Sequence, residues 1–86
     1  MGESIGKQLK QARLKRGLSV EDISHETRIP VARLRDLEDD NYADFPSPTY
    51  ARSFLTIYSD FLEVDAAEFM EALKGPNSPL IAGRNY

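Results

Sequence analysis

VEDISHETRIPVARLRDLE, residues 20–38, is the stretch that decides the fold of this chain. Ser24 supplies a small side chain where two crossing helices would approach closely, and aliphatic residues follow at Ile29, Leu34 and Leu37. This spacing locks two short helices at a steep angle and predicts a helix-turn-helix. Arg28 stands where the turn usually has glycine. A left-handed conformation there would cost about 1 kcal/mol, so we expect a turn slightly different from the common form.

A basic amphipathic helix is predicted before this motif, at about residues 4–16. Three apolar residues recur at helical spacing and indicate its buried face: Ile5, Leu9 and Ala12. Ser4 is the expected N-cap, and Gly17 is the expected terminator. Ser19 then opens the second helix, with Asp22 as the partner in a capping box.

Two more helices are predicted after the motif. Ser47 followed by Pro48 is a strong start for a helix over about residues 48–62. Asp65 is the expected N-cap of a fifth helix, with Glu68 as its capping-box partner. The sequence therefore predicts an all-α, five-helix bundle of the lambda repressor-like kind. Its domain covers residues 1–75, and residues 76–86 form a flexible tail or linker.

Length and composition exclude several function classes. A domain of 86 residues buries only about 60–65% of its unfolded surface and has little room for an internal catalytic cleft. The chain has no cysteine, which excludes disulfides, thiolate metal sites and cysteine nucleophiles. No apolar run approaches the roughly 18 residues that a membrane span needs. We expect a soluble chain whose contact with a membrane, if any, is made through a segment outside it.

The charge is distributed unevenly along the chain. Residues 1–17 carry five cations against one acid, whereas residues 18–45 carry three cations against eight acids, and the net charge is −3. A protein that neutralises many phosphates is expected to be basic, at least on its reading face. Only weak, salt-sensitive and non-specific binding to nucleic acid is therefore expected. The residues expected to drive it are Lys7, Lys10, Arg13, Lys15, Arg16, Arg28 and Arg33.

The third predicted helix, which follows Pro30, would read DNA in a helix-turn-helix regulator. Its outward positions offer only Arg33 and Arg35 as long donors, and neither Asn nor Gln is available to pair with adenine. Acidic residues at its end would repel a phosphate backbone. These features favour packing or a protein contact. Sequence-specific DNA binding is the alternative, with Arg28, Arg33 and Arg35 as the candidate contacts.

Two apolar stripes run along residues 48–62. The first consists of Ala51, Leu55, Tyr58 and Leu62, and the second of Tyr50, Phe54, Ile57 and Phe61. One stripe is enough to seat a helix on a small bundle. Exposed aromatic rings beside an arginine are typical anchors of protein interfaces. We therefore predict a partner-binding site at Tyr50, Phe54, Arg52 and Ile57, although for Ile57 and Phe61 a place in the core is an equal alternative.

The motifs together resemble the N-terminal cytoplasmic domain of the RodZ family, whose members resemble Cro/CI-type helix-turn-helix proteins. The resemblance is carried by IGKQLKQARLKRGLSVEDIS, residues 5–24, and RLRDLEDDNYADFPSPTYARSFLTIYSDFLEVDAAEF, residues 33–69. Its most distinctive part is Phe45-Pro46-x-Pro48 followed by YARSFL, residues 50–55. Ser24 replaces the family's usual alanine.

The resemblance implies an adaptor in a bacterial cell-shape protein. Members of the RodZ family are bitopic membrane proteins whose cytoplasmic helix-turn-helix domain binds the actin-like MreB filament. The family's aromatic contact pair falls here on Tyr50 and Phe54. The chain would then be the cytoplasmic part of an inner-membrane protein, with the transmembrane helix outside it. The alternative is a DNA-binding transcription regulator of the Cro/CI type.

Other chemistries have little support in the sequence. His25 is the single histidine and has no second metal ligand in helical register, so we expect it on the solvated surface. Paired acids such as Asp39 and Asp40 are expected to be solvated rather than to act as an acid–base dyad. There is no glycine-rich phosphate loop. We predict no enzymatic activity, no cofactor, no metal and no small-molecule substrate.

Overall fold

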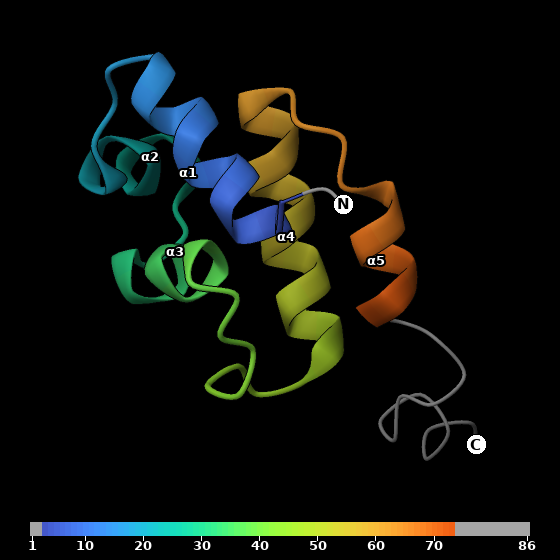
Figure 1. Cartoon of the computed structure of the whole chain (residues 1–86). Coiled ribbons are helices and arrows are strands. Elements are labelled where there is room, and N and C mark those ends of the chain that lie inside the picture. The colour runs from blue at the N-terminus through green and yellow to red at the C-terminus, as the bar shows by residue number, and fades with distance from the viewer. Residues whose placement is uncertain (1–2, 74–86) are drawn as a thin grey trace, which may run out of the picture.

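A computed structural model describes residues 3–73 of the chain. Over this range the protein is all-helical, with helices α1 (Ile5–Lys15), α2 (Val20–Thr27), α3 (Val31–Glu38), α4 (Pro48–Leu62) and α5 (Ala67–Leu73). The predicted all-α bundle is confirmed (Figure 1). The tail predicted at residues 76–86 lies outside the described residues.

The helix starts are set by local hydrogen bonds, as predicted. Ser4 caps α1 by accepting from the backbone N–H of Lys7 at 3.1 Å. Ser19 and Asp22 form a reciprocal capping box at the start of α2, with distances of 2.9 and 3.0 Å. Ser47 caps α4 by accepting from the N–H of Tyr50. Each cap satisfies a backbone donor that the first turn of a helix leaves unpaired.

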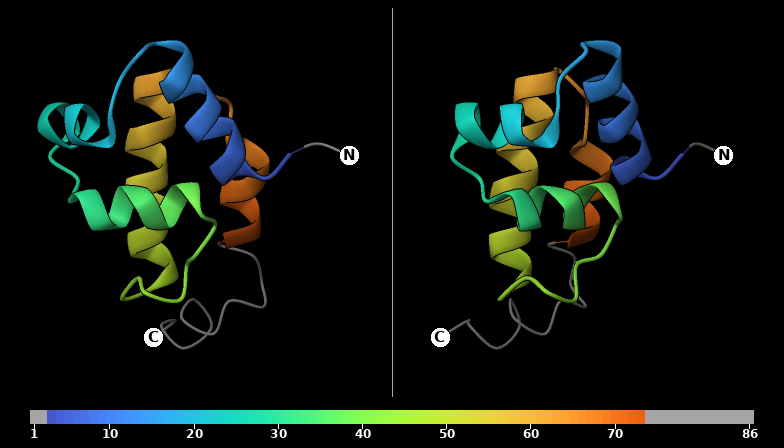
Figure 2. Two further views of the ribbon diagram at one scale, coloured as in Figure 1. Left: turned by 60° about the vertical axis from the view of Figure 1, so that its left-hand side comes forward. Right: turned by 90° about the vertical axis from the view of Figure 1, so that its left-hand side faces the viewer.

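The turn of the helix-turn-helix contains a residue in the left-handed conformation that is not glycine. Arg28 has φ of 67° at the end of α2, so the strained conformation considered above is the one adopted. Ser24 spans the turn because its hydroxyl donates to the carbonyl of Ile29 at 2.6 Å. The three aliphatic residues of the motif are buried: Ile29, Leu34 and Leu37. The pair α2–α3 is thereby fixed at the angle seen in Figure 2.

α4 is the central element of the bundle, and α1, α2, α3 and α5 all contact it. Its first stripe is entirely buried: Ala51, Leu55, Tyr58 and Leu62. Its second stripe is outside the core to different degrees, with Tyr50 and Ile57 exposed and Phe54 and Phe61 half-buried. Ile57 was expected either in the core or on the surface, and the structure places it on the surface.

The start of α5 differs from the prediction by one residue. The helix begins at Ala67, and the carbonyl of Ala66 accepts the first helical hydrogen bond, from Met70 at 3.0 Å. Ala66 is therefore the N-cap, and Asp65 lies just before it. The Asp65 carboxylate accepts from the N–H of Ala67 at 3.0 Å. Asp65 thus still satisfies a first-turn donor, but Glu68 is not its capping-box partner.

α1 and α3 approach each other closely at Gly6. A Cβ atom added there would lie 2.4 Å from the carbonyl oxygen of Glu38 and 2.5 Å from that of Leu37. The N–H of Gly6 donates to the Asp40 carboxylate at 2.9 Å. Asp40 is exposed, as expected, and its carboxylate also places a negative charge at the start of α1, where the helix dipole favours it.

Candidate protein-interaction site

Four aromatic rings form a continuous row from the interior to the surface beside the start of α4. Tyr42 and Phe45, in the loop between α3 and α4, have ring centroids 6.0 Å apart. The buried ring of Phe45 lies 6.2 Å from Phe54, which lies 5.2 Å from Tyr50. Tilted pairs at these distances are favourable for aromatic rings. The outer rings therefore rest on a buried one, and Tyr50 is left 48% exposed.

The outer rings border a shallow depression of about 300 Å³ between the starts of α3 and α4. Six residues line it, and we call them the aromatic patch: Pro30, Ala32, Arg33, Pro46, Tyr50 and Phe54. All but Arg33 are uncharged, and most of the surface they offer is apolar. The two rings and Pro46 were predictable from the sequence, because they belong to one distinctive motif. Pro30 and Ala32 were not, because they join the patch only when α3 folds against α4.

Arg33 is the cation of the aromatic patch. Its guanidinium carbon lies 5.4 Å from the centroid of the Phe45 ring, a cation–π geometry. Its Nη1 donates to the carbonyl of Asp44 at 2.9 Å, and its Nη2 lies 2.9 Å from the Asp36 carboxylate. Arg33 is therefore held against the loop, beside the rings.

The structure places Arg52 away from the patch, which corrects its predicted position. Two residues correspond to about 200° around a helix, so Arg52 lies on the opposite side of α4 from Tyr50. One turn further on, the Thr56 hydroxyl lies 3.2 Å from the Met70 sulfur of α5, which identifies this as the side facing α5. Ile57 is on the same side as Tyr50, is 42% exposed, and extends the apolar surface beyond the patch.

The candidate nucleic-acid contacts do not converge on one surface. Arg28 is exposed at the end of α2, and Arg35 is exposed on α3 with its guanidinium 3.5 Å from Glu21. Arg33 and Arg35 are two positions apart and so point to opposite sides of α3. The beginning of α3, which would enter a groove, exposes Pro30 and Ala32. Neither side chain carries a donor or acceptor for a base edge.

A buried polar network joins three helices at the centre of the bundle. Arg13 of α1 forms two hydrogen bonds with the Glu38 carboxylate of α3, at 2.7 and 3.0 Å. The hydroxyl of Tyr58, on α4, donates to the same carboxylate. Arg13 also donates to the carbonyl of Leu18 at 2.9 Å. We call Arg13, Glu38 and Tyr58 the buried network.

The buried network removes one cation, Arg13, from the exposed surface of the basic helix α1. Arg13 is buried and paired with Glu38, so it is unavailable to a phosphate. Its inclusion among the nucleic-acid contacts was therefore wrong. The same hydrogen bonds with Glu38 raise the pKa of its guanidinium and keep it charged. Burial, followed by the hydrogen bond to Glu38, raises the pKa of Tyr58. No local pattern reveals the network, because Arg13 and Glu38 are far apart in sequence.

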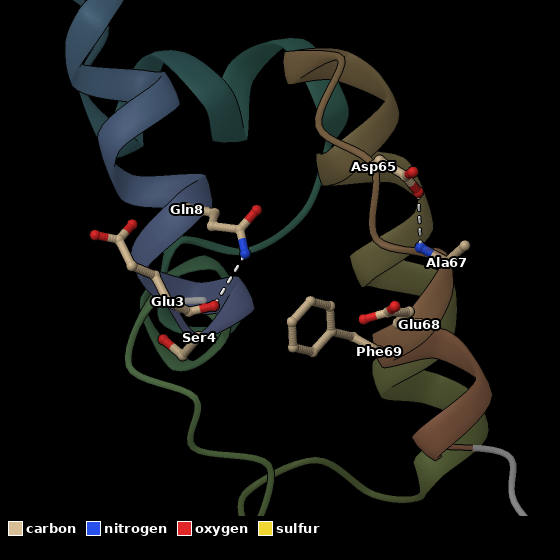
Figure 3. Close-up of a pocket in the computed structure, with 7 residues that line it drawn as sticks. All are labelled: Glu3, Ser4, Gln8, Asp65, Ala67, Glu68 and Phe69. Carbon is tan, nitrogen blue, oxygen red and sulfur yellow. Dashed lines mark hydrogen bonds between the residues drawn. The ribbon is translucent and has the colours of Figure 1, made fainter. Parts of the chain in front are cut away.

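A depression with a volume of about 710 Å³ lies between the starts of α1 and α5. Figure 3 shows Phe69 extending from α5 toward α1, with Glu68 beside it. Ser4 is occupied as the cap of α1, and no histidine lines the depression to act as its base. The lining therefore lacks the arrangement for nucleophilic chemistry. His25 is exposed on α2, as predicted.

Neither a metal site nor a membrane span was found within residues 3–73. In that range no group of three or more histidine or carboxylate side chains is placed to hold a metal ion. The helices of the described range are also too short or too polar to cross a bilayer.

Comparison with known proteins identifies relatives. A family model described as "Helix-turn-helix domain" matches residues 8–69. The chain is 36% identical over 70 residues to the "Cytoskeleton protein RodZ" of Streptococcus pneumoniae (strain ATCC BAA-255 / R6). The aligned part covers 81% of this chain and 25% of that relative, so the chain spans about a quarter of its length. No solved structure matches the chain significantly.

Proposed function

We propose that this chain, which belongs to the RodZ family of helix-turn-helix domains, is a cytoskeletal adaptor that binds an actin-like filament of the MreB type. The relative's name supports a cytoskeletal role, and the aromatic patch supplies a surface suited to a protein partner. The chain would be the cytoplasmic part of a cell-shape protein whose membrane-spanning segment lies outside it.

The observation that carries this proposal is the exposure of Tyr50 on a rigid aromatic support. An apolar ring left 48% exposed costs hydration free energy that a partner can recover by covering it. The Phe54 ring, which rests on Phe45, packs against Tyr50 and restricts its motion, so little conformational entropy is lost on binding. Rigid aromatic anchors with an arginine at the edge are typical of interface hot spots, and Arg33 occupies that edge.

The alternative, a DNA-binding regulator, has weaker support. The beginning of α3 presents Pro30 and Ala32, and the cations of the motif are dispersed or engaged with acids. We expect any affinity for duplex DNA to be non-specific, of the order of 10⁻⁴–10⁻⁶ M at physiological salt. A selection from random duplexes that returned one consensus bound at nanomolar strength would overturn the adaptor proposal.

Co-sedimentation with a polymerised MreB-type protein tests the proposal directly. Tyr50→Ala should weaken binding about thirtyfold, which corresponds to the roughly 2 kcal/mol typical of a lost anchor. Leu14→Ala is the matched control, since Leu14 is similarly exposed, at 56%, but lies on α1. It should bind like the parent chain.

The possible failures have different meanings. If Tyr50→Ala melts like the parent and binds with parental affinity, the aromatic patch is not the binding surface. If the parent chain itself fails to sediment with the filament, the MreB-type partner is wrong.

A further inference from the structure

The outward side of α1 is a second surface that the proposed function does not use. Lys7, Lys10, Gln11 and Leu14 are exposed and recur at three- and four-residue spacing, and Lys15 adjoins them. The opposite side of α1 is seated in the core through Ile5, Leu9 and Arg13. We call these five exposed residues the α1 face.

The cations of the α1 face are not neutralised by acids. α1 contains no acidic residue, and none of the ion pairs found within residues 3–73 involves Lys7, Lys10 or Lys15. Asp65 borders a depression together with Lys15, but the two form no ion pair in this range. The α1 face is thus a local excess of positive charge on a chain with a net charge of −3.

Leu14 lies among these cations and is the most exposed large hydrophobic residue of the described range, at 56%. It is on the convex outer side of a helix, with cations before and after it along the helix. A leucine gains little from contact with the charged phosphate backbone of a duplex, which is the part that lysines recognise. It gains free energy where a charged surface covers an apolar layer, as in a lipid bilayer.

We propose that the α1 face docks on a bilayer of anionic lipids. Lys7, Lys10 and Lys15 would contact the negative headgroups, and Leu14 would enter the boundary with the acyl chains. The acidic remainder of the molecule is repelled by the same headgroups, so a single orientation is favoured. This docking is peripheral, does not involve a spanning segment, and is independent of the filament proposal.

The α1 face and the aromatic patch lie toward opposite ends of α4. Arg16 donates to the carbonyls of Phe61 and Leu62, at 3.4 and 3.2 Å, which fixes the end of α1 beside the end of α4. Tyr50 is at the other end, twelve residues earlier than Leu62 and therefore about 18 Å away along the axis. One molecule could thus contact a bilayer with α1 and a protein partner with the start of α4. Figure 1 shows α1 beside the later half of α4 rather than beside its start.

Vesicle flotation with the full chain tests the proposal. The vesicles contain equal parts of phosphatidylglycerol and phosphatidylcholine, and pure phosphatidylcholine vesicles serve as the neutral reference, both in about 0.1 M salt. We expect binding to the anionic vesicles only. Lys10→Gln with Lys15→Gln should weaken it about 25-fold, and Leu14→Ala about fivefold. Arg28→Gln with Arg35→Gln removes the same charge from other helices and should have little effect.

Three results would overturn the proposal: no binding to anionic vesicles, equal binding to both vesicle types, or equal weakening by the two double variants. A fourth is tighter binding to duplex DNA than to anionic vesicles, with Leu14→Ala affecting neither, which would make the α1 face a nucleic-acid contact. The filament assay keeps the two proposals separate. Leu14→Ala should weaken vesicle binding alone, whereas Tyr50→Ala should weaken filament binding alone.

Discussion

Tyr58 and Tyr50 lie on the same helix, two turns apart, and have opposite surroundings. Tyr58 is fully buried, and its hydroxyl donates to the carboxylate of Glu38 in the buried network. Tyr50 rests on Phe54 at the edge of the bundle and is 48% exposed. The two side chains are chemically identical, so the difference comes from what the other helices cover.

The comparison shows that the buried network has all its partners within the chain, whereas the aromatic patch keeps an exposed surface that another molecule can cover. The network is complete within the chain, because Glu38 has both Arg13 and Tyr58 as donors. The aromatic patch is supported from beneath by the buried ring of Phe45, but its outermost ring, Tyr50, is exposed to solvent. Substitutions in the network should therefore change folding, and those in the patch should change binding.

The largest expected effect is that of Glu38→Ala. Removing the carboxylate leaves the Arg13 guanidinium buried without its counter-charge, which typically costs about 3–5 kcal/mol of the free energy of unfolding. Urea denaturation measures this loss. The triple variant Arg13→Met, Glu38→Leu and Tyr58→Phe should recover much of the stability, because it replaces the whole buried network by apolar side chains that need no polar partner. A loss below about 1 kcal/mol for Glu38→Ala would contradict the role given to the network.

Gly6→Ala should come next. The added methyl group would meet the carbonyl oxygens of Glu38 and Leu37 at about the positions given above, so α1 and α3 would have to separate. Overpacking of this kind costs about 1–3 kcal/mol. Gly17→Ala is the matched control, because nothing lies within 4 Å of its Cβ position and the only penalty is that alanine disfavours the φ of 69° that glycine adopts there. Its cost should be about 1 kcal/mol. Equal melting temperatures for the two variants would argue against a close approach at Gly6.

A smaller effect is expected from Tyr58→Phe, which removes only the hydroxyl. Loss of one hydrogen bond to a charged group corresponds to about 1.5–3 kcal/mol, but Glu38 keeps both bonds from Arg13, so the lower end applies. Urea denaturation at neutral pH gives this value. A loss as large as that of Glu38→Ala would mean that Tyr58, rather than Arg13, compensates the carboxylate.

The same tyrosine should make stability depend on alkaline pH. The folded chain raises the pKa of Tyr58 above its ordinary value of about 10, and burial raises the pKa of Tyr42 to about 12. The stabilisation is therefore fully present below pH about 10 and is lost as the pH rises, because the unfolded chain releases these protons first. Urea midpoints measured from pH 8 to pH 11 should fall, and fall less in Tyr58→Phe. A flat profile in the parent chain would contradict this.

The smallest effect on folding is expected at the aromatic patch. Tyr50→Ala should change the free energy of unfolding by about 0.5 kcal/mol or less, because its side chain is largely solvated. Phe54→Ala should cost more, since its ring contacts buried Phe45. Thermal melts of the two variants test this order. If the melting temperature of Tyr50→Ala were as low as that of Glu38→Ala, the distinction between the aromatic patch and the buried network would be lost.

The sequence predicted those parts of the fold that depend on neighbours along the chain. The caps at Ser4, Ser19 and Ser47 are local, and so is the spacing that buries one stripe of α4. The pairing of Arg13 with Glu38 was missed because a charge on an amphipathic helix gives no sign of its partner on another helix. The direction of Arg52 was wrong for a simpler reason: residues adjacent in sequence point to different sides of a helix.

The candidate site was predictable to the same extent. Tyr50 and Phe54 stand out as a stripe that a small bundle does not need, and that periodicity is visible in the sequence. Pro30 and Arg33 join them only because α3 packs against α4. The cation of the site was therefore assigned to the nearest arginine in sequence rather than to the nearest one in space.

The row of rings from Tyr42 to Tyr50 also provides a site for a fluorescent probe of binding. The chain contains no tryptophan, so one introduced as Tyr50→Trp would be the sole indole fluorophore. At this position it would be half in water and half against Phe54. Its emission should shift to shorter wavelength when a partner covers the ring. Binding at the aromatic patch could therefore be followed by the emission wavelength of this tryptophan, without labelling the partner.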